Sequence, residues 1–219
     1  DEYYAPFTTY VDVNNLRIFG LEEVDPTFVG NVGKAYEAMF ESTSLTDSGM
    51  QDDLYAGMKK RYVLQRVGYI GPEYYDEIRE EPGKGKYGDQ RVDYIWEMPS
   101  SSTESQTGEV LEHLLHTLTA IGFHYAFSEE WAWNDSESDV RMAMQEAIDA
   151  GHYDVSGYDN LKSDEEYHRI LAQEFAYWMI MAEWDYFGVI GMTANEEWDI
   201  TTPAEMAKEL PLGHELYNS

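Results

Sequence analysis

Two long segments of the chain carry apolar residues at the spacing of an α-helix. In residues 108–124, GEVLEHLLHTLTAIGFH, leucines and other apolar residues recur three and four positions apart. That spacing places them on one face of a helix. Residues 163–188, SDEEYHRILAQEFAYWMIMAEWDYFG, repeat the pattern. A chain with two such helices must build much of its core from packed helices, and we expect the first helix to end at Gly122.

Strand signals cluster near the N-terminus. Residues 8–20 alternate polar and apolar side chains around Asn14 and Asn15, which is typical of a β-hairpin. Residues 62–69 are rich in β-branched and aromatic side chains and indicate another strand. The sequence therefore predicts an α+β fold, a mostly helical domain with a small N-terminal sheet, and we expect one domain over residues 1–219.

Capping signals predict further helices. These signals are Asp25-Pro26, Ser163 with Glu166, and Thr202 with Glu205. Two more helices are expected to begin at Ser48 and Asp139. Gly151 is the predicted stop of the helix that begins near Asp139. Residues 70–107 are rich in Gly, Pro, Ser and charge, and predict a long, partly irregular connection.

The charge balance excludes several classes of partner. The chain has 14 Lys and Arg against 43 Asp and Glu, a formal net charge of −29. Nucleic acids and anionic membrane surfaces need Lys and Arg to neutralise phosphates, so neither is expected as a partner. The chain has no cysteine, which excludes disulfides and thiolate chemistry. No run of 18 apolar residues predicts a membrane span, and the start at DEYYAPF favours a secreted, extracellular or periplasmic protein.

The polar face of the first long helix carries groups that bind metals. Its members are Glu109, Glu112, His113, His116 and Thr119. Glu112 and His116 are four residues apart, so they lie one turn apart and can grip a single ion. The alternative is a solvated face with exposed histidines. His124 follows the expected end of the helix.

The second long helix carries Glu174 in the middle of its apolar stripe. A carboxylate on an apolar face is costly unless it is paired, protonated or bound to a cation. Two readings follow: a hydrogen bond to a buried Tyr or Trp, or a third metal ligand delivered from a downstream helix.

With EHLLH at residues 112–116 followed by QEFAYW at residues 173–178, the chain resembles the gluzincin zinc metallopeptidases, especially the lethal-factor-like and related bacterial secreted branches. Those proteins carry H-E-x-x-H on one helix and a Glu ligand on a later helix. The resemblance covers residues 17–188. It implies that Glu112, His116 and Glu174 bind one divalent metal, most naturally zinc, in a site more anionic than the family's.

The resemblance also implies a reaction. His113 stands where the family has its catalytic Glu, so the order of the first two motif residues is reversed. A secreted metallopeptidase-like protein would hydrolyse a peptide or protein substrate with His113 as the base. Tyr153, Tyr158 and Tyr167 are the candidates for steadying the oxyanion. The reversed pair favours the alternative, a pseudoenzyme that serves as a binding or assembly module of an extracellular structure.

Other sites have less support. A di-iron bundle needs E-x-x-H twice, and only residues 165–168 provide it. No pair of carboxylates is singled out for a glycosidase. The acidic loops at residues 134–139 and 153–160 offer oxygen ligands for calcium but match no EF-hand pattern.

Overall fold

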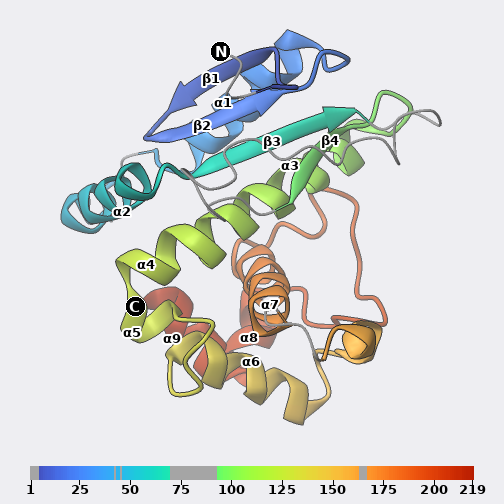
Figure 1. Cartoon of the computed structure of the whole chain (residues 1–219). Helices are drawn as coiled ribbons and strands as arrows, with labels where there is room; N and C mark the ends of the chain where they lie inside the picture. Colours follow the sequence, from blue (N-terminus) through green and yellow to red (C-terminus); the bar gives the residue numbers. More distant parts are fainter. Residues whose placement is uncertain (1–4, 42, 45, 70–92, 163–166) are drawn as a thin grey trace. The chain divides into compact units, whose positions relative to one another are not determined.

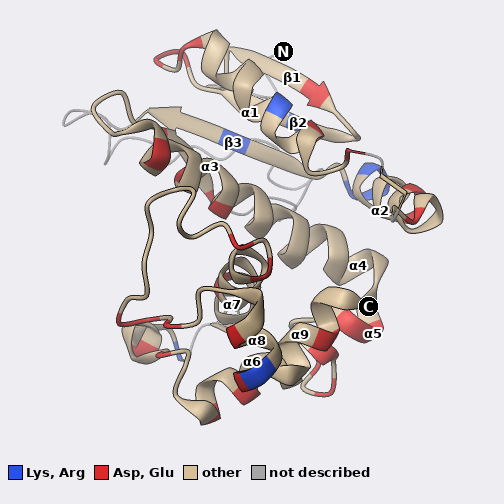
Figure 2. Cartoon of the chain, turned by 180° about the vertical axis from the view of Figure 1, so that it is seen from behind, with Lys and Arg blue, Asp and Glu red and all other residues tan. Residues whose placement is uncertain are grey.

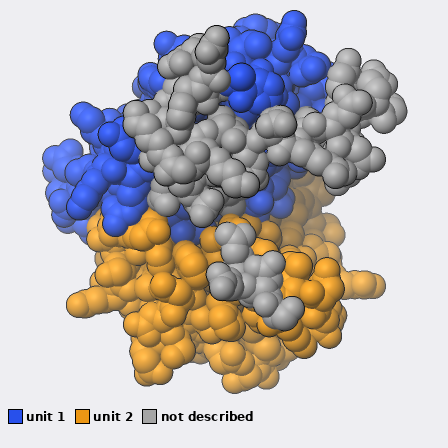
Figure 3. Space-filling model, in the orientation of Figure 1, with its two compact units in different colours: residues 1–122 blue, residues 123–219 orange. Residues whose placement is uncertain are grey.

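The computed structural model describes residues 5–41, 43–44, 46–69, 93–162 and 167–219. Within these ranges helices predominate, and a four-stranded mixed sheet lies in the N-terminal part of the chain (Figure 1). The predicted α+β class is therefore confirmed. The chain divides into two compact units, residues 1–122 and 123–219 (Figure 3). That these units form a single domain stays a prediction.

The sheet begins with the predicted hairpin. Strands β1 (Thr9–Val13) and β2 (Leu16–Gly20) are antiparallel. Asn14 and Asn15 have φ angles of 45° and 63°, the left-handed conformation that two-residue hairpin turns require. The hairpin is confirmed.

Two parallel strands complete the sheet. Strand β3 (Leu64–Tyr69) pairs with β2, and β4 (Tyr94–Glu97) pairs with β3, in the order β1-β2-β3-β4. The strand predicted at residues 62–69 is confirmed. The irregular connection predicted for residues 70–107 is wrong at β4, because β-branched and aromatic side chains there outweigh the surrounding polar residues. It is also wrong at residues 103–107, which are helical because the Ser102 side chain caps a helix that begins at Thr103. Residues 70–92 lie outside the described ranges.

Two helices of the first unit start where the sequence predicts, one after the predicted cap Asp25 and the other at Ser48. Helix α1 (Pro26–Ala38) begins after Asp25, whose side chain accepts a hydrogen bond from the Thr27 amide. It contacts β1 and β2. Helix α2 (Ser48–Arg61) begins after Asp47, whose carboxylate accepts hydrogen bonds from the amides of Gly49 and Met50.

The histidine-bearing helix continues beyond its expected end. Helix α3 (Thr103–Thr117) runs into a π-helical segment, η2 (Leu118–Phe123), and then into α4 (His124–Ala126). The predicted stop at Gly122 is wrong. A Cβ at Gly122 would lie 3.0 Å from Leu54 Cδ1, so the glycine permits close packing and does not end the helix.

The described part of the second unit is helical. Its elements are α5 (Ser128–Trp131), α6 (Asp139–Ala150), η3 (Ser156–Leu161), α7 (Tyr167–Glu183), α8 (Pro203–Glu209) and α9 (Pro211–Asn218). Gly151 ends α6 with a φ angle of 81°, and Thr202 with Glu205 forms the predicted capping box of α8. The sequence did not predict α9. The capping box predicted at Ser163 and Glu166 lies outside the described ranges.

Helix α7 is the centre of the second unit's core. It contacts α6, α8 and α9, and almost every residue from Leu171 to Glu183 is buried. Phe175 is fully buried and packs edge-on against Trp198, which is also fully buried. Glu174 is the half-buried exception in this stretch.

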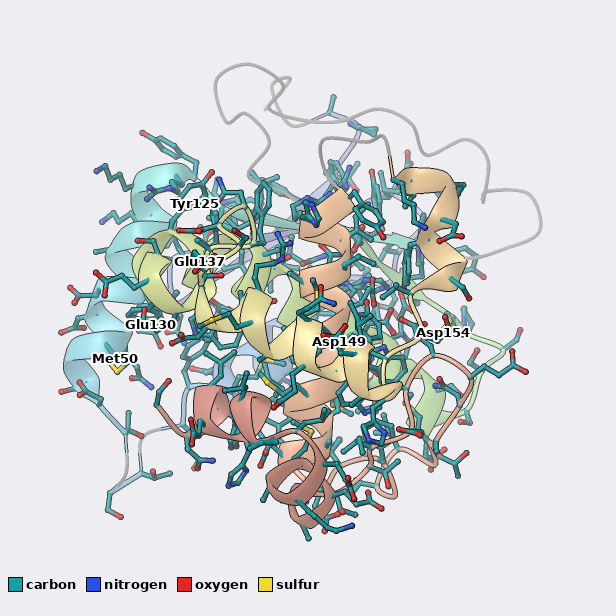
Figure 4. The ribbon with its side chains drawn as sticks, turned by 90° about the horizontal axis from the view of Figure 1, so that it is seen from below. Met50, Tyr125, Glu130, Glu137, Asp149 and Asp154 are labelled. Atoms are coloured by element: carbon teal, nitrogen blue, oxygen red, sulfur yellow. The ribbon has the colours of Figure 1, made fainter. Side chains whose placement is uncertain are left out.

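Acidic residues occur on elements of both units, and basic ones are sparse (Figure 2). Residues 123–219 carry 21 acidic and 4 basic side chains. Four of the acidic ones, labelled in Figure 4, come from α5, the loop before α6, the end of α6 and the loop after it: Glu130, Glu137, Asp149 and Asp154. Among the described residues, no helix combines the length and the apolar character needed to cross a bilayer.

Candidate metal centre

Three metal-ligating side chains converge in the first unit. Ligand atoms of Asp93, His113 and His116 all lie within 4.8 Å of one another. Asp93 Oδ2 lies 3.0 Å from His116 Nδ1 and 3.8 Å from His113 Nδ1. The two imidazole rings meet edge to face, with their centroids 5.4 Å apart. One carboxylate thus faces two imidazoles.

The packing of α3 on β4 sets this geometry. His113 and His116 are three residues apart on α3, so both project from one side of the helix. Asp93 immediately precedes β4, which contacts α3. Gln106 fixes the two elements together, because its side chain accepts from the Met98 amide at 2.7 Å and donates to the Trp96 carbonyl at 2.8 Å.

Glu109 forms a second link between α3 and β4. Its Oε1 accepts a hydrogen bond from the Trp96 amide at 2.8 Å and lies 3.1 Å from His113 Nε2. The side chains of Glu109 and His113 are 15% and 14% exposed. A nearly buried carboxylate therefore supports one imidazole from the side opposite Asp93.

Burial and charge act against each other in this cluster. His116 is fully buried, whereas the side chain of Asp93 is 43% exposed. Burial lowers the pKa of His113, but the carboxylates of Asp93 and Glu109 outweigh it and raise that pKa to about 9. Burial raises the pKa of Asp93, but the imidazoles of His113 and His116 outweigh it and hold that pKa below its usual range.

The three side chains fit a divalent metal. Ligand atoms about 2 Å from a shared zinc ion lie about 3.3 Å from one another in a tetrahedral arrangement. The two distances from Asp93 Oδ2, 3.0 and 3.8 Å, bracket that value. His113 Nδ1 is buried and has no hydrogen-bond partner in the part of the chain that the structure describes. Two imidazoles and one carboxylate form a donor set that zinc and Fe²⁺ both accept.

The ligand set predicted from sequence overlaps this cluster at His116. A carboxylate oxygen of Glu112 lies within 4.8 Å of a ring nitrogen of His116, as their helical spacing predicts. Glu174 belongs to α7 of the second unit, so its place beside Glu112 and His116 stays a prediction. His116 is buried, which rules out a solvated face at this position of α3.

The other predicted site residues lie in the second unit. The hydroxyl of Tyr153 is buried and donates to the Leu171 carbonyl at 3.1 Å, and burial raises the pKa of Tyr153. The hydroxyl of Tyr158 donates to Glu197 at 2.8 Å. Tyr167 is the first residue of α7. Their predicted role at an oxyanion is untested. The His124 ring stacks on Trp133, with centroids 4.8 Å apart.

Sequence reasoning missed Asp93 as a ligand and gave no role to Glu109. Asp93 lies 20 residues before His113, and only the pairing of β4 with β3 and its contact with α3 bring the two together. The available signal was the strand-forming run Tyr94, Ile95 and Trp96 directly after it. Glu109 was placed on the polar face but given no role, although its spacing of four from His113 predicts contact.

Neither acidic loop provides a comparable group. In the described part of the chain, no three His, Asp or Glu side chains of residues 134–139 or 153–160 lie close enough to share an ion. Calcium binding by these loops stays a prediction.

The chain matches no protein-family model, no curated protein and no solved structure.

Proposed function

We propose that the protein binds one divalent metal ion, most naturally zinc, through Asp93, His113 and His116. The observation that carries this proposal is the convergence of two imidazoles on one carboxylate, with the buried His113 Nδ1 lacking a hydrogen-bond partner among the described residues. Buried polar atoms in folded proteins normally have a partner. A cation shared with Asp93 would supply it.

The donor set favours a catalytic over a structural metal. Structural zinc sites use four protein ligands, whereas catalytic sites use three and keep one position for substrate. Among the described residues the cluster has three, and the Asp93 side chain is 43% exposed. A metal held there would supply a Lewis acid that polarises a peptide carbonyl. We therefore propose metal-dependent peptide hydrolysis, which is the reaction that the gluzincin resemblance implies, although the ligand set differs from the one it implies.

His113 is a ligand in this proposal and not the base. Its two ring nitrogens face Asp93 and Glu109, and its pKa of about 9 keeps it protonated at neutral pH when no metal is bound. A general base needs an unprotonated nitrogen near the water it activates. The competing arrangement has Glu112, His116 and Glu174 as ligands, which leaves His113 as the base.

One observation favours the second candidate function, a non-catalytic binding or assembly module. Extended peptides often bind by adding a strand to a sheet edge. Along β4, the amide and carbonyl of Trp96 and the amide of Met98 are already hydrogen-bonded to Glu109 and Gln106 of α3. A peptide substrate therefore could not bind by adding a strand at these positions of β4. This counts against hydrolysis and favours a module without hydrolytic activity.

Calorimetric titration of chelator-treated protein with zinc tests the proposed site. We expect one zinc per chain, with binding weakened by Asp93→Asn and by His113→Ala. Glu112→Gln and Glu174→Gln are matched carboxylate controls that should bind as the wild type does. The reverse pattern, loss with Glu112→Gln and Glu174→Gln only, would assign the metal to the competing set.

A generic peptidase assay separates the two functions. Hydrolysis that zinc restores after chelation supports the enzyme. Tight zinc binding without hydrolysis of any peptide in a broad library supports the module. Absence of zinc uptake would overturn both proposed ligand sets and the hydrolysis, and would leave the non-catalytic module.

A further inference from the structure

We propose that Glu109 is a positioning residue that holds the proton of the His113 imidazole on Nε2, so that Nδ1 is the nitrogen offered to the metal. This inference rests on the proposed function and goes beyond it, because it assigns the ring orientation and the ligating atom. It depends on contacts within the first unit alone.

The first step concerns where the proton of a neutral imidazole lies. The ring then has one N–H and one lone pair, and a carboxylate acceptor holds the N–H on the nitrogen that faces it. Glu109 Oε1 lies 3.1 Å from His113 Nε2. The lone pair therefore falls on Nδ1, which faces Asp93 Oδ2 at 3.8 Å.

The second step concerns why Glu109 is held in place. The same Oε1 accepts the Trp96 amide of β4 at 2.8 Å, and Glu109 precedes His113 by one helical turn. The carboxylate is thus fixed both along α3 and against the sheet. Partners of this kind behind a ligating histidine typically contribute tenfold to a hundredfold to metal affinity.

The experiment compares zinc affinity and imidazole tautomer in three variants. Glu109→Ala should lower zinc affinity by about tenfold to a hundredfold, and Glu109→Gln, which retains a carbonyl acceptor, should lower it less. Gln106→Ala is the matched control. It removes two hydrogen bonds to the same edge of β4 one turn earlier on α3 but contacts neither imidazole, so its zinc affinity should equal that of the wild type.

Long-range 15N–1H spectra of histidine-labelled protein supply the second readout. In zinc-loaded wild type, His113 should show a protonated Nε2 and a metal-bound Nδ1. In Glu109→Ala the ring should show both tautomers or bind through Nε2. If Glu109 only stabilised the fold, Glu109→Ala would lower stability but leave the 15N–1H pattern of His113 unchanged.

The outcomes separate the two proposals. If wild type takes up zinc but Glu109→Ala binds it equally well with the same tautomer, the inference is wrong and the metal site stands. Equal losses in Glu109→Ala and Gln106→Ala would also overturn it. If wild type takes up no zinc, the proposed function fails. The tautomer of metal-free His113 at alkaline pH, where the ring is neutral, then decides whether Glu109, 3.1 Å from Nε2, orients the ring.

Discussion

Helices α3 and α7 bury different kinds of side chain. Most of α7 from Leu171 onward is buried and apolar, and it supplies the second unit's core. Helix α3 instead directs polar side chains at β4 and at Asp93, the residue before it. Gln106 and Glu109 form hydrogen bonds to the backbone of β4 and Met98, and the two histidines face Asp93. Apolar packing explains most of α7, although Gln173 and Glu183 are buried polar side chains. It does not explain α3, where leucines would cover β4 at lower cost.

The contrast teaches where to look for function in a helical protein. A core helix tolerates exchange among apolar residues of similar volume. A network of buried polar groups requires every partner at its position. The convergence of two histidines and two carboxylates on α3 and β4 is therefore the part of the described chain that stability alone does not account for.

The largest expected effect is on α7. Phe175→Ala should lower the free energy of unfolding by about 3–5 kcal/mol, because it leaves a cavity at a fully buried site. Urea unfolding followed by circular dichroism measures it. Met142→Ala on α6, at a side chain 41% exposed, is the control and should change stability by about 0.5 kcal/mol or less. The folded Phe175→Ala protein should keep its zinc affinity; its loss would show that α7 and the metal site are not independent.

The second largest expected effect is on zinc binding by α3. His116→Ala should reduce zinc affinity by about a hundredfold or more, because it removes a ligand common to both proposed sets. His152→Ala is the control, since it removes another His–Asp pair in the second unit, in which His152 Nδ1 lies 2.7 Å from Asp199 Oδ1. Equal zinc binding by the wild type and His116→Ala would place the metal elsewhere.

A third prediction uses pH to sharpen the role of α3. The folded pKa of His113, about 9, exceeds the ordinary 6.5. In the metal-free protein its charge therefore adds stability below pH 6.5, and that stability is lost as pH rises through 9. Zinc must displace this proton, so zinc affinity should rise by up to about tenfold per pH unit between pH 7 and 9. His113→Gln should flatten both dependences, measured by thermal unfolding and calorimetry. A pH-independent wild type would contradict the raised pKa.

These predictions depend on a part of the structure that sequence reasoning reached only partly. Local signals placed the hairpin turn at Asn14, the start of α1 at Asp25 and the end of α6 at Gly151, because each position satisfies a backbone requirement by itself. The strand β4 was missed because it is only four residues long in a polar neighbourhood. Asp93 was missed with it, since no local rule links it to His113.

The α3 histidines show what spacing can and cannot establish. Helical periodicity correctly placed Glu112 beside His116. It could not show that His116 is buried, or that both histidines face a strand that the sequence had not predicted. Gly122 misled for the opposite reason, because a glycine that permits close packing against Leu54 looks in sequence like a helix stop.

The smallest expected effect concerns charge. The second unit has 21 acidic and 4 basic side chains in 97 residues, and the first has 22 and 10 in 122. Salt shortens the range of repulsion to about 10 Å at 0.1 M. Added sodium chloride should therefore slow amide hydrogen exchange more in α6 and α9 than in β1 to β3. An equal response in both regions would show that the difference in charge density has no effect on stability.

X-ray absorption of the zinc-loaded protein tests the central claim most directly, because it counts the imidazoles bound to the metal. The site of Asp93, His113 and His116 predicts two imidazole nitrogens at about 2.0–2.1 Å, and one of them should disappear in His113→Ala. The competing set of Glu112, His116 and Glu174 predicts one imidazole, unchanged in that variant. Two imidazoles falling to one would support a metal bound between α3 and Asp93; a single imidazole in the wild type would contradict it.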